Sequence, residues 1–241
     1  MKTLLNDKFA PLTYQVGFLE TTLENALEVF LKWQSEIGVE FDRQPRHERL
    51  AGSLQQALAR LEPLTTPPTK VLLMETRSQW TAFFDNGLRV SDPESPVGHL
   101  CTILPSRGVV VHCAPDRSQT RDRDALRIYG VVSFRMFVSH ETSWLNQERA
   151  VVAMNDGGSW LFSADGIQQP FEEPERYKAR RIADRLTGEM LERYCKALGI
   201  KLFDEAFYGM KAALINTVQK LPPGAPVMSL EEARSHIVAI S

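Results

Sequence analysis

The stretch RAVVAMNDGGSWLFS, residues 149–163, indicates the fold class most directly. Two apolar runs, at residues 149–154 and 159–163, flank the turn sequence Asn155-Asp156-Gly157-Gly158. Asparagine, aspartate and glycine tolerate the backbone angles of tight turns, so apolar runs on both sides of them are typical of a β-hairpin. The stretch therefore predicts two antiparallel strands joined by a short loop.

Similar apolar runs precede this hairpin along the chain. Asn86-Gly87 is the dipeptide most typical of a two-residue hairpin turn, and Pro105-Ser106-Arg107-Gly108 predicts another tight turn. Repeated hairpins without helices between them favour an antiparallel meander over parallel βαβ units. The further strands predicted in this way are residues 70–75, 79–84, 98–104, 109–114 and 128–138.

The amino-terminal part combines one predicted strand with two predicted helices. Residues 14–19 alternate like a strand, which we expect to join the main sheet because sequential elements usually pack as neighbours. Thr21 with Glu24, and Ser53 with Gln56, match the capping box that begins many helices. The polar residues 42–49 between the two helices predict a loop.

Helices return in the carboxy-terminal part. Pro174 suits the first turn of a helix with an apolar stripe that ends at Leu186. Thr187 and Ser229 are the predicted N-caps of the last two helices. The predicted fold class is therefore α+β, with a largely antiparallel β meander packed against amino-terminal and carboxy-terminal helices.

The length of the chain bears on its domain organisation. A chain of 241 residues can bury a full core, and we expect a single α+β domain over residues 1–241. Prolines interrupt helices and strands alike, so the proline-rich segment 63–68 is the candidate sub-boundary within it. The part of the chain before this segment is small for an independent core.

Composition and charge disfavour several classes of protein. A formal net charge of −2 lacks the basic excess that nucleic-acid binding usually requires. The apolar runs are too short to span a bilayer, and the first residues lack the apolar core of a secretory signal. Three cysteines without paired spacing favour a reducing compartment. We expect a soluble cytoplasmic protein, a monomer or a homodimer, that binds neither nucleic acid nor a membrane.

The sequence lacks the motifs of common catalytic and nucleotide-binding families. It has no Gly-x-x-x-x-Gly-Lys phosphate loop and no Gly-x-Gly-x-x-Gly. His140-Glu141 begins like a zinc-protease helix, but Trp144 stands where the second histidine belongs. Gly157 to Leu161 approaches the nucleophile elbow and lacks its last glycine. The sequence therefore names neither a family nor a cofactor.

Cysteine and histidine form the strongest candidate chemical site. If residues 105–108 form a four-residue turn, Cys101 lies opposite His112, and strand alternation brings His99 to the same sheet face. These three side chains could ligate zinc, or Cys101 and His112 could act as nucleophile and base. A one-residue change of register would separate them, and a buried cysteine without a chemical role is the alternative.

The strand before Asn86-Gly87 offers a second candidate site. Trp80 and Phe84 share one face and are predicted core residues, whereas Phe83 and Asp85 share the other. An aromatic ring and a carboxylate beside a turn could line a ligand pocket. The alternative is a well-packed hairpin in which Asp85 supports the turn.

Two basic segments are candidate interaction surfaces. One is the loop at residues 116–124, in which charges of both signs alternate, and the other is the polar face of the helix predicted from Pro174. Either could meet an acidic partner, and either could be a solvated surface. The candidate interaction residues are Arg117, Arg121 and Arg123 in the loop, and Lys178, Arg181 and Arg185 in the helix.

Two main functions remain open at the level of sequence, beside a third, nucleic-acid binding through the basic helix predicted from Pro174, which the charge balance disfavours. The first is a protein-interaction protein, of the kind represented by inhibitors and toxin-neutralising immunity proteins. The alternative is a small enzyme or metal-binding protein that uses the cluster of Cys101, His112 and His99. We prefer the first, because the fold signals are complete and no recognisable catalytic motif accompanies them.

Overall fold

The computed structural model of the chain describes residues 1–40, 42–88, 91–118, 127–142 and 146–238. Its main feature is a nine-stranded sheet in the order β2-β10-β4-β5-β1-β6-β7-β8-β9, in which every neighbouring pair is antiparallel. The strands are β1 (Gln15–Leu19), β2 (Arg46–Ala51), β4 (Lys70–Thr76), β5 (Thr81–Asp85), β6 (Gly108–Ala114), β7 (Val131–Phe137), β8 (Gln147–Asn155), β9 (Trp160–Gly166) and β10 (Tyr208–Asn216). A two-stranded sheet pairs β3 (Leu64–Thr65) with β11 (Val227–Met228). The predicted α+β class with an antiparallel sheet is confirmed.

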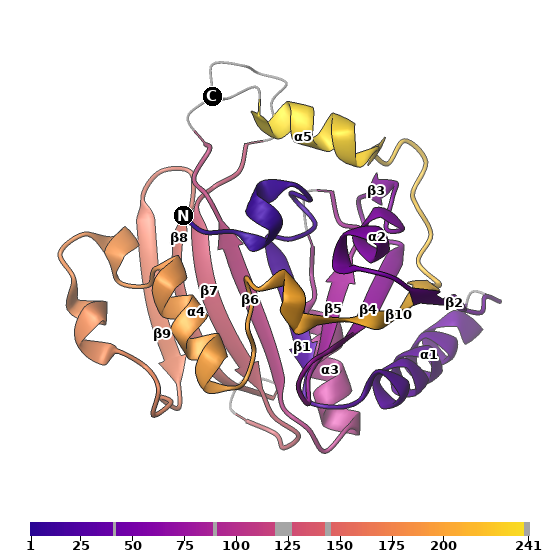
Figure 1. The fold of residues 1–241 in the computed structure, drawn as a ribbon, viewed down its shortest axis with the longest axis horizontal. Coiled ribbons are helices and arrows are strands. Elements are labelled where there is room, and N and C mark those ends of the chain that lie inside the picture. Colours follow the sequence, from indigo (N-terminus) through magenta and orange to yellow (C-terminus); the bar gives the residue numbers. More distant parts are fainter. Residues whose placement is uncertain (41, 89–90, 119–126, 143–145, 239–241) are drawn as a thin grey trace.

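The amino-terminal strand lies in the middle of the sheet. β1 pairs with β5 on one side and with β6 on the other, so the prediction that this strand joins the main sheet is confirmed. β2 and β9 form the two edges, and Figure 1 shows them at opposite sides of the molecule.

Helices cover the two faces of the sheet unequally. α1 (Leu23–Val39) and α3 (Glu94–Ile103) pack on one face, in an apolar cluster that includes Phe30, Leu100 and Val110. The larger cluster occupies the other face, beneath α2 (Leu54–Ala59), α4 (Gly188–Ala197) and α5 (Leu230–Val238). Short 3-10 turns complete the fold: η1 (Leu4–Asp7), η2 (Pro174–Lys178), η3 (Ile182–Asp184) and η4 (Glu205–Phe207).

The face covered by α1 and α3 is left open toward one edge of the sheet. Among the described residues, the apolar cluster on this face includes none from β8 or β9. Met154 of β8 and Leu161 of β9 pair across these strands and remain 39% and 44% exposed. One face of the β8–β9 end is therefore not covered by a helix within the described chain.

Most predicted helix starts agree with the hydrogen bonds at the caps. Ser53 and Gln56 form a complete capping box, and Thr187 accepts a hydrogen bond from the Met190 amide. At α1 the cap is Thr22, whose hydroxyl accepts from the Asn25 amide, one residue after the predicted Thr21. A shift of one residue is the usual uncertainty of a helix boundary read from sequence.

The predicted strand at residues 98–104 is wrong, because this segment belongs to α3. Val97, Leu100 and Cys101 are buried at helical spacing, against α1 and β6. Gly108 lets the helix lie close to β6, since a Cβ there would stand 2.6 Å from the sulfur of Cys101. The apolar residues of a short helix and of a short strand look alike in sequence, and tertiary packing decided between them.

Asn86-Gly87 does not form a hairpin turn, contrary to the prediction. The hairpin joins β4 to β5 through residues 77–80, before this dipeptide. Asn86 is fully buried, and its side chain accepts from the amides of Thr69 and Lys70 and donates to the carbonyl of Pro63. Its amide group therefore links the proline-rich segment 63–68 to the main sheet.

Two further segments differ from the prediction. Part of the predicted loop at residues 42–49 is the edge strand β2. The helix predicted from Pro174 is broken into η2 and η3, because Ala179 and Arg181 take extended backbone angles. Tyr177 and Arg185 instead fold onto the ring of Phe162 in β9, and these contacts favour the broken form over a regular helix.

Candidate functional sites

The cysteine and histidine residues singled out in the sequence do not come together. Cys101 is fully buried under α3, and burial raises the pKa of its thiol to about 12. His99 lies on the outer side of the same helix, with its ring centroid 4.8 Å from that of Trp33. His112 lies on β6. The shared sheet face is wrong because residues 98–104 are helical, and a thiol in this setting stays protonated at neutral pH.

Metal-binding geometry is likewise missing from the described part of the chain. No three histidine, cysteine, aspartate or glutamate side chains within it are grouped so that they could hold a metal ion. Cys113 and Cys195 are also buried, and burial raises the pKa of each thiol. All three cysteines therefore behave as small core residues.

His112 belongs to a different constellation, a row of polar side chains that crosses the sheet. Gln15 pairs with His112, and His112 pairs with Ser133, so the three share one sheet face. Gly17 pairs with Phe83, and the same register places Asp85 beside Gln15. The sequence shows each of them as a polar residue in a largely apolar strand, but only the register brings them into one row.

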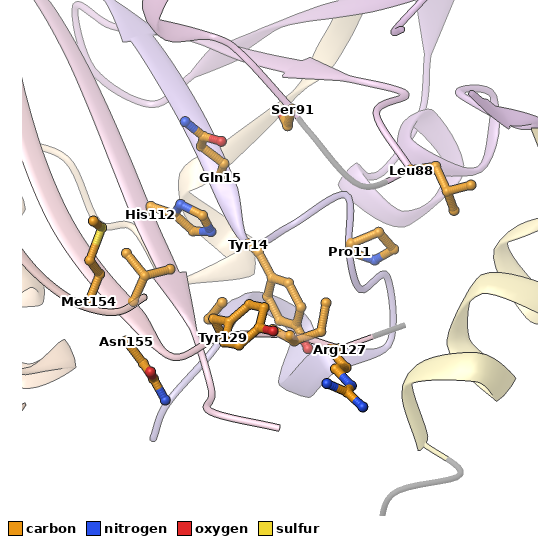
Figure 2. A pocket seen from close by; sticks show the side chains of 13 residues that line it. Pro11, Tyr14, Gln15, Leu88, Ser91, His112, Arg127, Tyr129, Met154 and Asn155 are labelled. Atoms are coloured by element: carbon orange, nitrogen blue, oxygen red, sulfur yellow. The ribbon is translucent and has the colours of Figure 1, made fainter. Parts of the chain in front are cut away.

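A cavity of about 340 Å³ opens beside this polar row (Figure 2). Gln15 and His112 lie next to each other on β1 and β6, and Tyr14, Tyr129 and Met154 line the same space. The remaining lining residues are Pro11, Leu88, Ser91, Ala114, Arg127, Ile128, Val131 and Asn155. The walls are therefore largely apolar, with a few hydrogen-bonding groups placed among them.

The electrostatics of this cavity favour neutral side chains. Burial, helped by the charge of Arg135, lowers the pKa of His112 to about 4, so the imidazole is uncharged at pH 7. Burial, helped by the charge of Asp7, raises the pKa of Tyr14 to about 12. Arg127 is the one charged residue among the lining side chains of the described chain. The cavity can thus donate and accept hydrogen bonds, but its described lining residues offer no base with a pKa near 7.

The hydroxyl of Ser91 forms a hydrogen bond with the carboxylate of Asp85, the last residue of β5 and a member of the polar row. The Ser91 hydroxyl donates to Asp85 Oδ2 at 2.8 Å, and the Gly87 amide donates to Oδ1 at 2.8 Å. Burial raises the pKa of Asp85 to about 6. Phe83, the other member of the pair predicted to line a pocket, packs against Phe30 in the core. Asp85 therefore supports the chain around Gly87, although no hairpin turn forms there as the alternative interpretation expected. Phe83 and Asp85 both line a cavity of about 270 Å³ beside α1, as the pocket interpretation expected.

The charged loop of the sequence analysis lies partly outside the described residues. Arg121 and Arg123 belong to that undescribed part. Arg117 is described, and its guanidinium pairs with Asp7 at 2.8 Å. Its backbone amide also bonds to Ile128, at the stem of the same loop and at the wall of the cavity. Arg117 is therefore held by contacts within the chain.

The second basic segment, residues 174–185, lies against the edge strand β9, and we call it the basic cap. Three of its guanidinium groups are exposed and have no hydrogen-bond or ion-pair partner among the described residues. Lys178 pairs with Glu175, and Arg185 donates to the carbonyl of Ala179 over the Phe162 ring. The unpaired groups belong to Arg176, Arg180 and Arg181, so of the three predicted interaction residues here only Arg181 is free of such contacts.

A buried polar network anchors the basic cap to the sheet. Arg149 of β8 forms two hydrogen bonds with the Glu172 carboxylate, at 2.8 Å and 2.6 Å, and both side chains are almost fully buried. Tyr177 donates to the same carboxylate and contacts the hydroxyl of Tyr194 in α4. Bidentate pairs of this kind fix geometry as well as charge. The cap therefore has a defined position beside β9.

The two edges of the sheet differ in how they are protected. β2 carries Arg46, His47, Glu48 and Arg49, the charged type of edge that resists pairing with other chains. β9 pairs with β8 at seven successive positions, without a bulge or proline, and its single charged residue is Asp165. Within the described chain nothing pairs with the other side of β9. This edge can therefore accept a further strand.

No family model, curated protein or solved structure matches this chain in the comparisons with known proteins. Among the helices of the described residues, none is long and apolar enough to cross a membrane.

Proposed function

We propose that this chain is a protein-binding protein, as inhibitors and immunity proteins are, and that it binds an extended acidic segment of its partner at β9. The observation that carries the proposal is the edge of β9, next to the three exposed arginines of the basic cap, which like that edge have no partner among the described residues. In such an arrangement, backbone hydrogen bonds from the sheet edge supply affinity and neighbouring side chains supply selectivity.

The charge of the basic cap supports an acidic partner. Arg176, Arg180 and Arg181 are exposed, and the buried pair of Arg149 and Glu172 holds the segment that carries them. A complementary charge on the partner speeds association and selects against other partners. Carboxylates suit this site, because guanidinium groups bind them with paired hydrogen bonds.

The same charges disfavour the pairing of β9 with β9 of a second copy. Such a pair would bring two basic caps to the same edge, and like charges at an interface cost free energy.

The open face of β8 and β9 suits the apolar residues of the partner segment. When that segment pairs with β9, the exposed side chains of Met154 and Leu161 would contact its side chains. An extended partner with acidic and apolar residues in alternation fits both features.

The test uses the full chain and fluorescently labelled peptides of defined sequence. A peptide of alternating glutamate and valine should bind at least tenfold more tightly than one of alternating lysine and valine. Methylation of alternate backbone amides in the acidic peptide should weaken binding tenfold or more, because it removes the hydrogen bonds to β9. Fluorescence anisotropy at fixed salt measures both effects.

The matched variants locate the binding site. The triple variant R176A/R180A/R181A should lose at least tenfold in affinity for the acidic peptide. The control K32A/R46A/R77A removes the same charge from exposed residues elsewhere and should bind like the parent chain. Equal losses in both variants, or undiminished binding of the methylated peptide, would refute the proposal. Tighter binding of oligothymidine than of the acidic peptide would indicate that the partner is a nucleic acid and not a protein.

A further inference from the structure

We propose that the cavity beside Gln15 and His112 binds a small planar molecule whose edge carries a hydrogen-bond donor next to an acceptor, as a primary carboxamide or a nitrogen heterocycle does. This site is separate from the β9 edge and the basic cap, although Met154 of β8 also belongs to the open face described above, and the proposal does not depend on the protein partner.

The first argument is the unpaired state of the polar groups that line the cavity. Gln15 is only 9% exposed, yet its amide has no hydrogen-bond partner among the described residues. The imidazole of His112, its cross-strand neighbour, also has none within that part of the chain. Gln15 is buried and His112 is half-buried, so these neighbouring groups on the cavity wall are open to hydrogen bonds from a bound molecule.

The second argument is the chemistry that these groups can recognise. The glutamine amide presents a donor and an acceptor side by side, and a neutral imidazole adds one of each. A side-chain amide forms paired hydrogen bonds with a planar edge that offers the complementary donor and acceptor, as glutamine does with adenine. A ligand edge of that kind would satisfy Gln15 and His112 together.

The third argument is the shape and charge of the walls. A volume of about 340 Å³ lies at the small end of the range for ligand pockets, which suits a molecule of one or two rings. The aromatic rings of Tyr14 and Tyr129 and the side chain of Met154 offer apolar contacts to a flat ring (Figure 2). Among the described lining residues there is no carboxylate, so the site does not favour a cation.

Nicotinamide is the probe, and N,N-dimethylnicotinamide is its matched control because its amide cannot donate a hydrogen bond. Titration into the isotope-labelled full chain, followed by NMR, should shift the side-chain amide signals of Gln15 and the ring signals of His112. The control compound should bind at least tenfold more weakly. The absence of shifts at these two residues at tens of millimolar nicotinamide, or equal binding of both compounds, would overturn the proposal.

Two variants separate ligand binding from folding. Gln15→Met keeps the length of the side chain and removes an unpaired amide, so the chain should fold with unchanged or higher Tm while nicotinamide affinity falls at least tenfold. His99→Gln, on the far side of α3, should leave the affinity unchanged. If Gln15→Met fails to fold, His112→Phe serves as the second variant with the same expected loss. A folded Gln15→Met or His112→Phe variant that binds nicotinamide normally would refute the site.

Discussion

The two ends of the nine-stranded sheet differ in how the chain covers and charges them. At the β2 end, the edge strand carries four charged or titratable side chains, and α1 packs on the adjoining strands β4 and β10. At the β9 end, the edge strand is almost uncharged, and one face of β8 and β9 has no helix on it in the described chain. The β2 edge is therefore protected against pairing with other chains, whereas the β9 edge is suited to it.

The β9 end and the inner strand β5 also bury carboxylates in different ways. Glu172, near β9, is paired with Arg149 and accepts further hydrogen bonds from Tyr177 and the Gln169 amide. Asp85, at the end of β5, accepts from an amide and a hydroxyl, and no cation pairs with it within the described chain. Removing one member of a buried pair leaves an uncompensated charge, whereas burial without a cation already disfavours the charged form of a carboxylate.

The largest effect should follow from breaking the pair at the β9 end. Glu172→Gln leaves the Arg149 guanidinium buried without its counter-charge, which should lower the free energy of unfolding by about 3–5 kcal/mol. Urea denaturation of the variant and the parent measures it. The double variant R149M/E172L should lose less than the single one, because it leaves no unpaired charge. A loss below 1 kcal/mol in Glu172→Gln would show that the pair does not anchor the basic cap.

A smaller and opposite effect should follow at Asp85. Its pKa of about 6 in the folded chain lies above the value of about 3.9 expected in the unfolded chain. Between these two values the folded state binds more protons, so stability should fall as the pH rises from 4 to 6 and then level off. Asp85→Asn removes that loss and should raise the free energy of unfolding by about 1–3 kcal/mol at pH 7.5.

The pH profile supplies the control for Asp85→Asn. At pH 4 the aspartate is already protonated in the folded chain, so variant and parent should have nearly the same stability. Unfolding measured at pH 4, 5, 6 and 7.5 should show the two curves separating over this interval. Parallel curves at every pH would contradict the buried, unpaired state of Asp85.

The smallest effect is expected at the exposed ion pair beside β2. Arg60 and Glu48 approach to 2.6 Å, but about half of each side chain is exposed. Exposed pairs of this kind contribute about 0.2–1 kcal/mol, since water screens them. Arg60→Gln should therefore lower Tm only slightly, and 1 M salt should remove the difference. A loss as large as that of Glu172→Gln would abolish the proposed contrast between the two ends.

The fold and the sites differed in how far sequence could predict them. The hairpin of β8 and β9 and the caps at Ser53 and Thr187 follow from local rules, because the residues that decide them are near neighbours in the chain. The candidate site at Cys101 depended on one strand assignment, and α3 replaced that strand. The arginines of the basic cap were visible in part, whereas their freedom from ion pairs required the structure.

The sequence by itself determined the α+β class, the antiparallel pairing of successive hairpins and the positions of most helix starts, since periodicity and turn residues act over a few residues. Only the tertiary structure decided which elements became neighbours. It placed β1 at the centre of the sheet, left β9 as an edge without a partner strand in the described chain, and aligned Gln15 with His112. Register and packing depend on contacts between distant parts of the chain, which local patterns do not specify.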